Sequence, residues 1–225
     1  MPGAEPPTDG LAAALGLPAG RPAQVLALGA HADDLEIGCG GTIARLLRER
    51  PDTRVQWVVL SAEGERAAEA RASADAWLGR AAHRVEISAQ PDGYLPYRAE
   101  AVKRAVMALK GDGEPDLVLT HRREDLHQDH RFLADLAGQA FRRARVLEFE
   151  IPKYDGDLGP MNLYVTLTRD ECTRKVEHLM AAFPSQLGHD WYTADTFWAL
   201  LRLRGVECHS PSGFAEAFTC RKLIV

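Results

Sequence analysis

The chain is poor in cysteine and has no long apolar segment. Its four cysteines lie far apart and form no C-x-x-C pair, so neither a disulfide framework nor a thiolate zinc knuckle is indicated. No stretch approaches the roughly 20 consecutive apolar residues that a membrane-spanning helix needs. Residues 1–20 are rich in Pro, Gly and Ala and lack the basic start of a secretory signal. We therefore expect a cytoplasmic protein with a flexible N-terminal leader over residues 1–20.

Basic residues are also in deficit. The chain carries 27 Lys and Arg against 32 Asp and Glu, a formal net charge of -5, which argues against nucleic acid or an anionic membrane as a partner. Repeats are absent. The length of 225 residues and a hydrophobic fraction of 46% suit one sizeable core. Residues 21–225 are therefore predicted to form a single domain, and a homo-oligomer is compatible with this composition.

Short apolar runs alternate with segments of helical period. Strands are expected at 24–28, 55–60, 84–87, 116–120, 146–149 and 163–167, and helices at 11–15, 42–50, 65–78, 100–109, 129–142, 169–182 and 194–204. This alternation is typical of parallel strands joined by crossover helices. The sequence thus predicts an α/β fold with a Rossmann-like open, mostly parallel sheet and helices on both faces. The segment 153–160 has the composition of a loop that can close over a ligand.

Two clusters of imidazole and carboxylate each follow one of these apolar runs. His31, Asp33 and Asp34 come after the run 25–28, and the segment 127–130 (His-Gln-Asp-His) comes after the run 117–119. In open α/β sheets, ligands bind outside the carboxyl ends of the strands, so segments far apart in the chain can meet there. Burying such groups without a partner is costly. Together the clusters predict a hydrolytic metal centre at the C-terminal ends of the strands.

Zinc in hydrolases usually has three nitrogen or oxygen ligands and an open position for water. His31, one of the two adjacent aspartates, and either His127 or His130 can supply that set. The second aspartate can then accept a proton from water, and the second histidine can donate to a substrate carbonyl oxygen. Asp125 or Asp129 can orient an imidazole from behind.

These residues also resemble a known family. The motifs Ala-His-Ala-Asp-Asp at 30–34, Gly-Cys-Gly-Gly-Thr at 38–42 and His-Gln-Asp-His at 127–130 are similar to those of the PIG-L/LmbE-like zinc-dependent N-acetylglucosaminyl deacetylases. Shorter similarities extend the resemblance over nearly the whole chain from Gln24, at Arg66, Glu69, Asp92, Gly93, 150–152, 185–186 and 216–218. The chain departs from the pattern at Ala32, where the family usually has proline. That change relaxes the loop but removes no ligand.

The resemblance implies a role for each motif residue. It implies Zn²⁺, or another divalent ion such as Fe²⁺, bound by His31, Asp34 and His130, with Asp33 as general base and His127 stabilising the oxyanion. The reaction would be hydrolysis of an N-acetyl group on a small-molecule amino-sugar conjugate, with release of acetate and a free amine. Asp129 is expected behind the ligands. Substrate contacts are expected at Arg66, Asp92 and Tyr154, although a helix start, an Asp-Gly turn and loop packing are alternative explanations for these three.

Two other functions fit parts of the pattern. His31, an aspartate and a distant histidine also match the two-histidine, one-carboxylate site of ferrous oxygenases, but those enzymes commonly have all-β folds, and Asp34 would then lack a task. A non-catalytic nucleotide-binding or carbohydrate-binding module is the second alternative. The glycines at 38–41 do not complete a G-x-G-x-x-G fingerprint, because its last position is Ile43.

Overall fold

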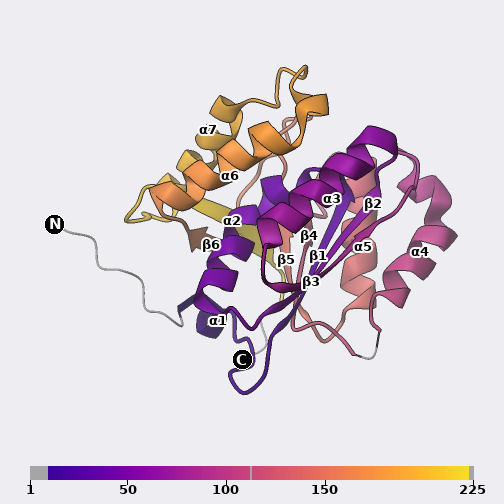
Figure 1. The fold of residues 1–225 in the computed structure, drawn as a ribbon, viewed down its shortest axis with the longest axis horizontal. Coiled ribbons are helices and arrows are strands. Elements are labelled where there is room, and N and C mark those ends of the chain that lie inside the picture. The colour runs from indigo at the N-terminus through magenta and orange to yellow at the C-terminus, as the bar shows by residue number, and fades with distance from the viewer. Residues whose placement is uncertain (1–9, 112, 223–225) are drawn as a thin grey trace.

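The computed structural model describes residues 10–111 and 113–222, and within them the strands form one seven-stranded sheet (Figure 1). The order across the sheet is β3-β2-β1-β4-β5-β7-β6. Strands β1 to β5 run parallel, whereas β7 is antiparallel to both β5 and β6. The bounds are β1 (Gln24–His31), β2 (Arg54–Ser61), β3 (Ala82–Ile87), β4 (Leu117–His121), β5 (Arg145–Phe149), β6 (Leu163–Thr166) and β7 (Ala215–Cys220). The predicted open, mostly parallel α/β sheet is confirmed.

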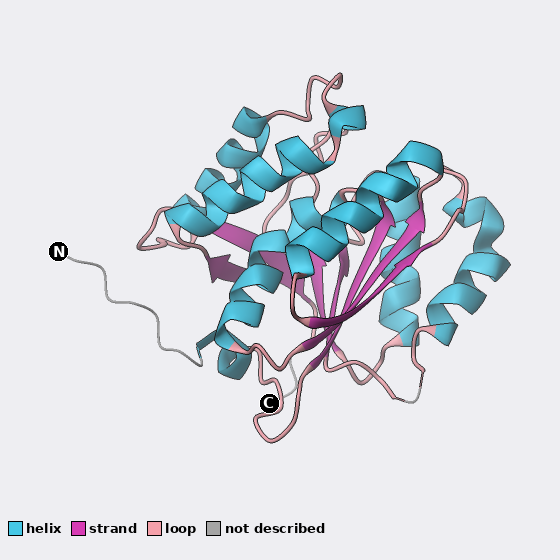
Figure 2. Ribbon diagram, viewed as in Figure 1, coloured by secondary structure: helices cyan, strands magenta, loops and turns pink. Residues whose placement is uncertain are grey.

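Helices cover both faces of this sheet (Figure 2). Val102 of α4 and Leu133 of α5 lie in the core of one face, and α1, α2, α3, α6 and α7 contribute to the core of the other. The central strand β1 is buried on both sides, which explains its unbroken apolar run. The helices are α1 (Gly10–Ala14), α2 (Asp34–Glu49), α3 (Gly64–Leu78), α4 (Ala99–Ala108), α5 (Gln128–Ala140), α6 (Arg169–Ala182) and α7 (Ala194–Glu207), with 3₁₀ turns at Leu95–Arg98 and Pro184–Gln186.

Helix α2 begins earlier than the sequence predicts. The expected helix starts at Thr42, yet the helix begins at Asp34 and includes three glycines, although glycine disfavours helix interiors. Close packing explains the glycines: a Cβ added at Gly38 would overlap the Phe149 ring, and one at Gly41 would crowd Glu216. The Glu216 carboxylate also accepts the backbone N–H groups of Gly41 and Thr42, each at 2.7 Å. Tertiary contacts therefore outweigh the low helix propensity.

The packed part of the chain begins before residue 20. Residues 1–9 of the expected leader lie outside the described residues, whereas Leu11, Leu15 and Leu17 are buried in the same core as α2. The backbone N–H of Leu11 donates to Glu49 Oε2 at 2.9 Å. Helix α1 is therefore part of the packed structure. No helix among the described residues is long and apolar enough to span a membrane.

Candidate metal centre

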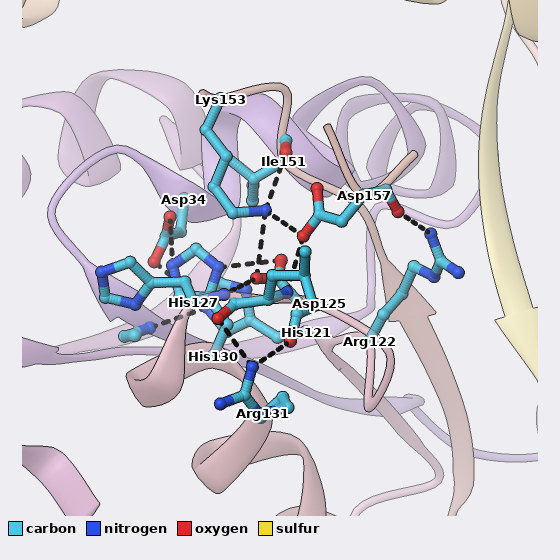
Figure 3. A network of polar contacts seen from close by, with 12 residues as sticks. Asp34, His121, Arg122, Asp125, His127, His130, Arg131, Ile151, Lys153 and Asp157 are labelled. Atoms are coloured by element: carbon cyan, nitrogen blue, oxygen red, sulfur yellow. Dashed lines mark hydrogen bonds and ion pairs between the residues drawn. The ribbon is translucent and has the colours of Figure 1, made fainter. Parts of the chain in front are cut away.

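The two motifs meet where β1 and β4 lie side by side. The chain adds β2 and β3 on one side of β1 and then crosses to β4 on the other, which creates a switch point of the kind where α/β sheets bind ligands. His31 ends β1, Asp34 opens α2, and His130 lies in the first turn of α5. Figure 3 shows Asp34 and His130 close together. His31 Nδ1 is 3.0 Å from His130 Nε2 and 3.4 Å from Asp34 Oδ2, while His130 Nε2 is 3.5 Å from Asp34 Oδ1.

The partners behind each ring determine which nitrogen carries a proton. His130 Nδ1 is 2.9 Å from Asp125 Oδ2, so its proton is held there and the Nε2 lone pair faces His31. His31 Nε2 lies 3.0 Å from Asp92 Oδ1 and 3.3 Å from Asp129 Oδ2, so the neutral His31 ring keeps its proton on Nε2 and directs its Nδ1 lone pair toward His130. Two lone pairs and the Asp34 carboxylate thus converge on one point. This donor set of two imidazoles and one carboxylate fits a divalent cation such as zinc.

The electrostatics of the site also favour a cation. Burial acts to raise the pKa of Asp34, but the His130, His121 and His31 rings outweigh it and hold that pKa well below its usual value. Burial and the neighbouring His121 lower the pKa of His130 to about 4. For His31, burial is outweighed by the surrounding carboxylates, with Asp34 foremost, and the pKa is raised well above its usual value. In the metal-free protein the centre therefore holds an ionised Asp34, a neutral His130 and a protonated His31, whose Nδ1 proton must leave when a cation binds.

Asp33 lies beside these groups, and one of its carboxylate oxygens has no hydrogen-bond partner among the described residues. It occupies the N-cap position of α2, but its side chain makes no capping hydrogen bond. Oδ1 accepts from Arg66 Nη2 at 3.0 Å, whereas the buried Oδ2 has no hydrogen-bond partner among residues 10–111 and 113–222. Burial raises the pKa of Asp33 despite the opposing charge of Arg66. Such a carboxylate is equipped to accept a proton.

His127 caps helix α5 and presents its other nitrogen as a donor. Its Nδ1 accepts the backbone N–H of Asp129 at 3.3 Å, so the proton of the neutral ring is on Nε2. Burial and the nearby His31 lower its pKa, which keeps the ring neutral. The ring centroids of His31 and His130 are 4.9 Å and 4.6 Å away. His127 can therefore donate a hydrogen bond beside the cation site.

Asp129 and Asp125 support the two imidazoles from behind. Besides its contact with His31, Asp129 accepts the backbone N–H groups of Gly93 and Leu95 at 2.8 and 3.0 Å, and so holds the turn that brings Asp92 to His31. His121 is a further imidazole at the centre, and the predicted site does not include it. The structure buries it, stacked on the His130 ring at 3.8 Å and with Nε2 3.1 Å from Asp34 Oδ2. Its place at the end of β4 was the only sequence signal.

The motif residues line a cleft of about 300 Å³. Its lining includes all three residues expected to contact substrate, Arg66, Asp92 and Tyr154, of which Tyr154 is 70% exposed. Trp191 also lines this cleft. A larger hollow of about 1110 Å³ between α4 and strands β2 and β3 contains none of the motif residues, so the chemistry assigns the site to the smaller cleft.

Residues 26–141, just over half of the chain, match the family model described as PIG-L: GlcNAc-PI de-N-acetylase. The chain belongs to the PIG-L family. The match confirms the resemblance to PIG-L/LmbE-like proteins that the sequence motifs indicated. Sequence matching and the cleft agree, because the matched region contains His31, Asp33, Asp34, His127 and His130.

Solved structures show that this PIG-L fold is shared more widely. A conserved protein from Thermus thermophilus is 20% identical, with a TM-score of 0.68 over 89% of this chain and 95% of that one. N,N'-diacetylchitobiose deacetylase from Pyrococcus horikoshii is 18% identical, with a TM-score of 0.66 over 92% and 88%. The 4-carboxy-2-hydroxymuconate hydratase from Pseudomonas putida is 19% identical, with a TM-score of 0.61 over 90% and 98%. Since one of these enzymes is a hydratase, fold alone does not determine the reaction of a PIG-L-like protein.

Proposed function

We propose that this PIG-L protein is a metal-dependent deacetylase that hydrolyses the N-acetyl group of an amino-sugar conjugate and releases acetate and a free amine. The observation that carries this proposal is the buried, unpartnered Asp33 Oδ2 beside the converging donor atoms of His31, Asp34 and His130. A free proton acceptor next to a cation site is what amide hydrolysis by water requires.

His31, Asp34 and His130 are the proposed ligands, with Zn²⁺ as the proposed ion and Fe²⁺ as an alternative. When bound, such an ion polarises the amide carbonyl and lowers the pKa of a bound water to roughly 7. The protein holds these donor atoms in the orientation that metal binding needs. Asp125 and Asp129 do so by holding the ring protons away from the cation.

Asp33 is the proposed general base. Its Oδ2 accepts a proton from the water that attacks the carbonyl carbon, and the same carboxyl returns that proton to the nitrogen as the C–N bond breaks. Arg66 keeps the carboxylate oriented through Oδ1. His127 Nε2–H donates to the carbonyl oxygen as negative charge develops there. Asp92 and Tyr154, at the edge of the cleft, are the proposed sugar contacts.

Neither alternative function accounts for these residues as fully as a deacetylase does. A ferrous oxygenase site of two histidines and one carboxylate leaves Asp33 and His127 without a task. A nucleotide-binding module would need the glycines of α2 to approach a ligand, yet a Cβ at Gly38 would overlap Phe149 and one at Gly41 would overlap Leu167. These glycines serve packing within the protein.

The proposal is tested by metal analysis and by acetate release from a panel of N-acetylated amino-sugar conjugates, with and without a chelator. We expect about one divalent ion per chain and chelator-sensitive acetate release. Asp33→Asn should keep the metal and lose roughly 10²- to 10⁴-fold in kcat, because the water loses its proton acceptor. Asp52→Asn, an exposed substitution at the opposite end of the sheet, is the control. Metal-free wild-type protein, or an Asp33→Asn variant with near wild-type turnover, would refute the mechanism.

A further inference from the structure

A largely buried lysine lies beside the candidate metal centre and is one of the residues that line its cleft. Lys153 follows β5 in the segment 151–158, which we call the strap, and its side chain is only 9% exposed. Its Nζ is 3.0 Å from Asp125 Oδ1 and 2.5 Å from Asp157 Oδ2, and it donates to the Ile151 carbonyl oxygen at 3.5 Å (Figure 3). An ammonium has three donors, and here each has an acceptor.

Asp125 connects this lysine to the proposed ligand His130. Its Oδ2 lies 2.9 Å from His130 Nδ1, while Oδ1 accepts both the Lys153 ammonium and the backbone N–H of His127 at 2.8 Å. Asp125 is 3% exposed, and a buried carboxylate needs a compensating cation and filled hydrogen-bond positions. Lys153 supplies both the compensating charge and a hydrogen bond, and it does so at Oδ1, the oxygen that does not contact His130.

Asp157 connects the same lysine to the strap. Its Oδ2 also accepts the backbone N–H of Leu126 at 2.7 Å, and its carbonyl oxygen accepts from Arg122 at 3.3 Å. The strap is thereby held against the turn at 122–127 that carries Asp125. The residue after the lysine is Tyr154, which lines the cleft. One ammonium therefore joins the wall of the cleft to the support of the metal centre.

We propose that Lys153 is a positioning residue: through Asp125 it fixes the His130 imidazole for metal binding, and through Asp157 it holds the strap and Tyr154 beside the cleft. This inference rests on the proposed function for the identity of His130 as a ligand. The proposal predicts that the contact of Lys153 with Asp125 and its contact with Asp157 have separable effects. Loss of the ammonium affects both metal affinity and substrate binding, whereas loss of the Asp157 charge affects substrate binding alone.

The test is a titration of metal-free protein with Zn²⁺ against a competing chelator, followed by steady-state kinetics at saturating Zn²⁺. Lys153→Met should weaken zinc binding about 10- to 100-fold, the usual effect of removing a partner behind a metal ligand, and should raise KM. Lys153→Arg should recover most of both. Asp157→Asn keeps an acceptor for Leu126 and should raise KM while its zinc affinity stays near wild type. Lys110→Met removes another i,i+4 pair, Lys110 with Glu114, far from the cleft, and should change neither quantity.

Two results would overturn the inference about Lys153. A Lys153→Met variant that binds zinc as tightly as wild type overturns the inference, and so does an Asp157→Asn variant with equally weakened zinc binding, because the effect would then belong to the strap as a whole. Should Lys153→Met fail to fold, Lys153→Gln, which keeps a donor without the charge, takes its place with the same expectations. Wild-type protein that binds no zinc would instead refute the metal site of the proposed function.

Discussion

Glu36 is a buried carboxyl in the first turn of α2, two residues beyond Asp34, and is only 1% exposed. Its Oε1 accepts from Ser73 Oγ at 2.5 Å, and Oε2 has no hydrogen-bond partner in the described part of the chain. Burial raises the pKa of Glu36 from 4.5 to about 8, against the opposing effect of the Ser73 hydrogen bond, and Asp33 and Asp34 contribute further. In the folded, metal-free protein Glu36 is therefore protonated at neutral pH.

This shift makes stability depend on pH with a definite sign. Between pH 4.5 and about 8 the folded state holds the Glu36 proton and the unfolded state releases it, so the free energy of unfolding falls as pH rises through that window. One proton corresponds to about 1.4 kcal/mol per pH unit when the two states differ fully. From pH 5 to pH 7 the contribution lost is about 2.5 kcal/mol, which for a chain of this size is roughly 5–10 °C in Tm.

Glu36→Gln isolates this contribution, because glutamine cannot ionise and still accepts from Ser73. We expect urea unfolding with a chelator present to show that the variant gains about 2.5 kcal/mol in free energy of unfolding relative to wild type between pH 5 and pH 7. Glu65→Gln, an exposed substitution in α3, serves as the control and should parallel wild type. Parallel stability profiles for wild type and Glu36→Gln would show that Glu36 titrates normally and refute the reasoning.

Two further predictions concern His127 and the glycines of α2. His127→Ala should lower kcat by about 10²-fold or more, the effect of losing one oxyanion donor, with metal content unchanged; a change confined to KM in steady-state kinetics would make His127 a substrate-positioning residue. Gly38→Ala should destabilise the fold by about 1–3 kcal/mol because its Cβ overlaps the buried Phe149 ring. Gly40→Ala, whose Cβ would lie 3.5 Å from Trp77 Nε1, should be neutral or stabilising by up to about 1 kcal/mol. Urea denaturation of the two variants side by side checks this contrast, and equal effects would contradict it.

The alternation of strands and helices could be predicted from the sequence because buried parallel strands form continuous apolar runs. The same order places His31 and the 127–130 motif at strand ends, so a shared site followed from topology. The predicted cytoplasmic location and the homo-oligomer stay predictions, as do the roles assigned to individual site residues.

Other features depend on side chains that meet only in the folded chain. The insertion of β7 between β5 and β6, the early start of α2, the pairing of Asp33 with Arg66 and the contact of Lys153 with Asp125 join segments whose local sequence carries no sign of the partner. Periodicity reports which face of an element is buried, but not which polar atom lies opposite it. The types and places of the reactive groups were therefore determined by the sequence, while their proton positions and supports were decided by packing.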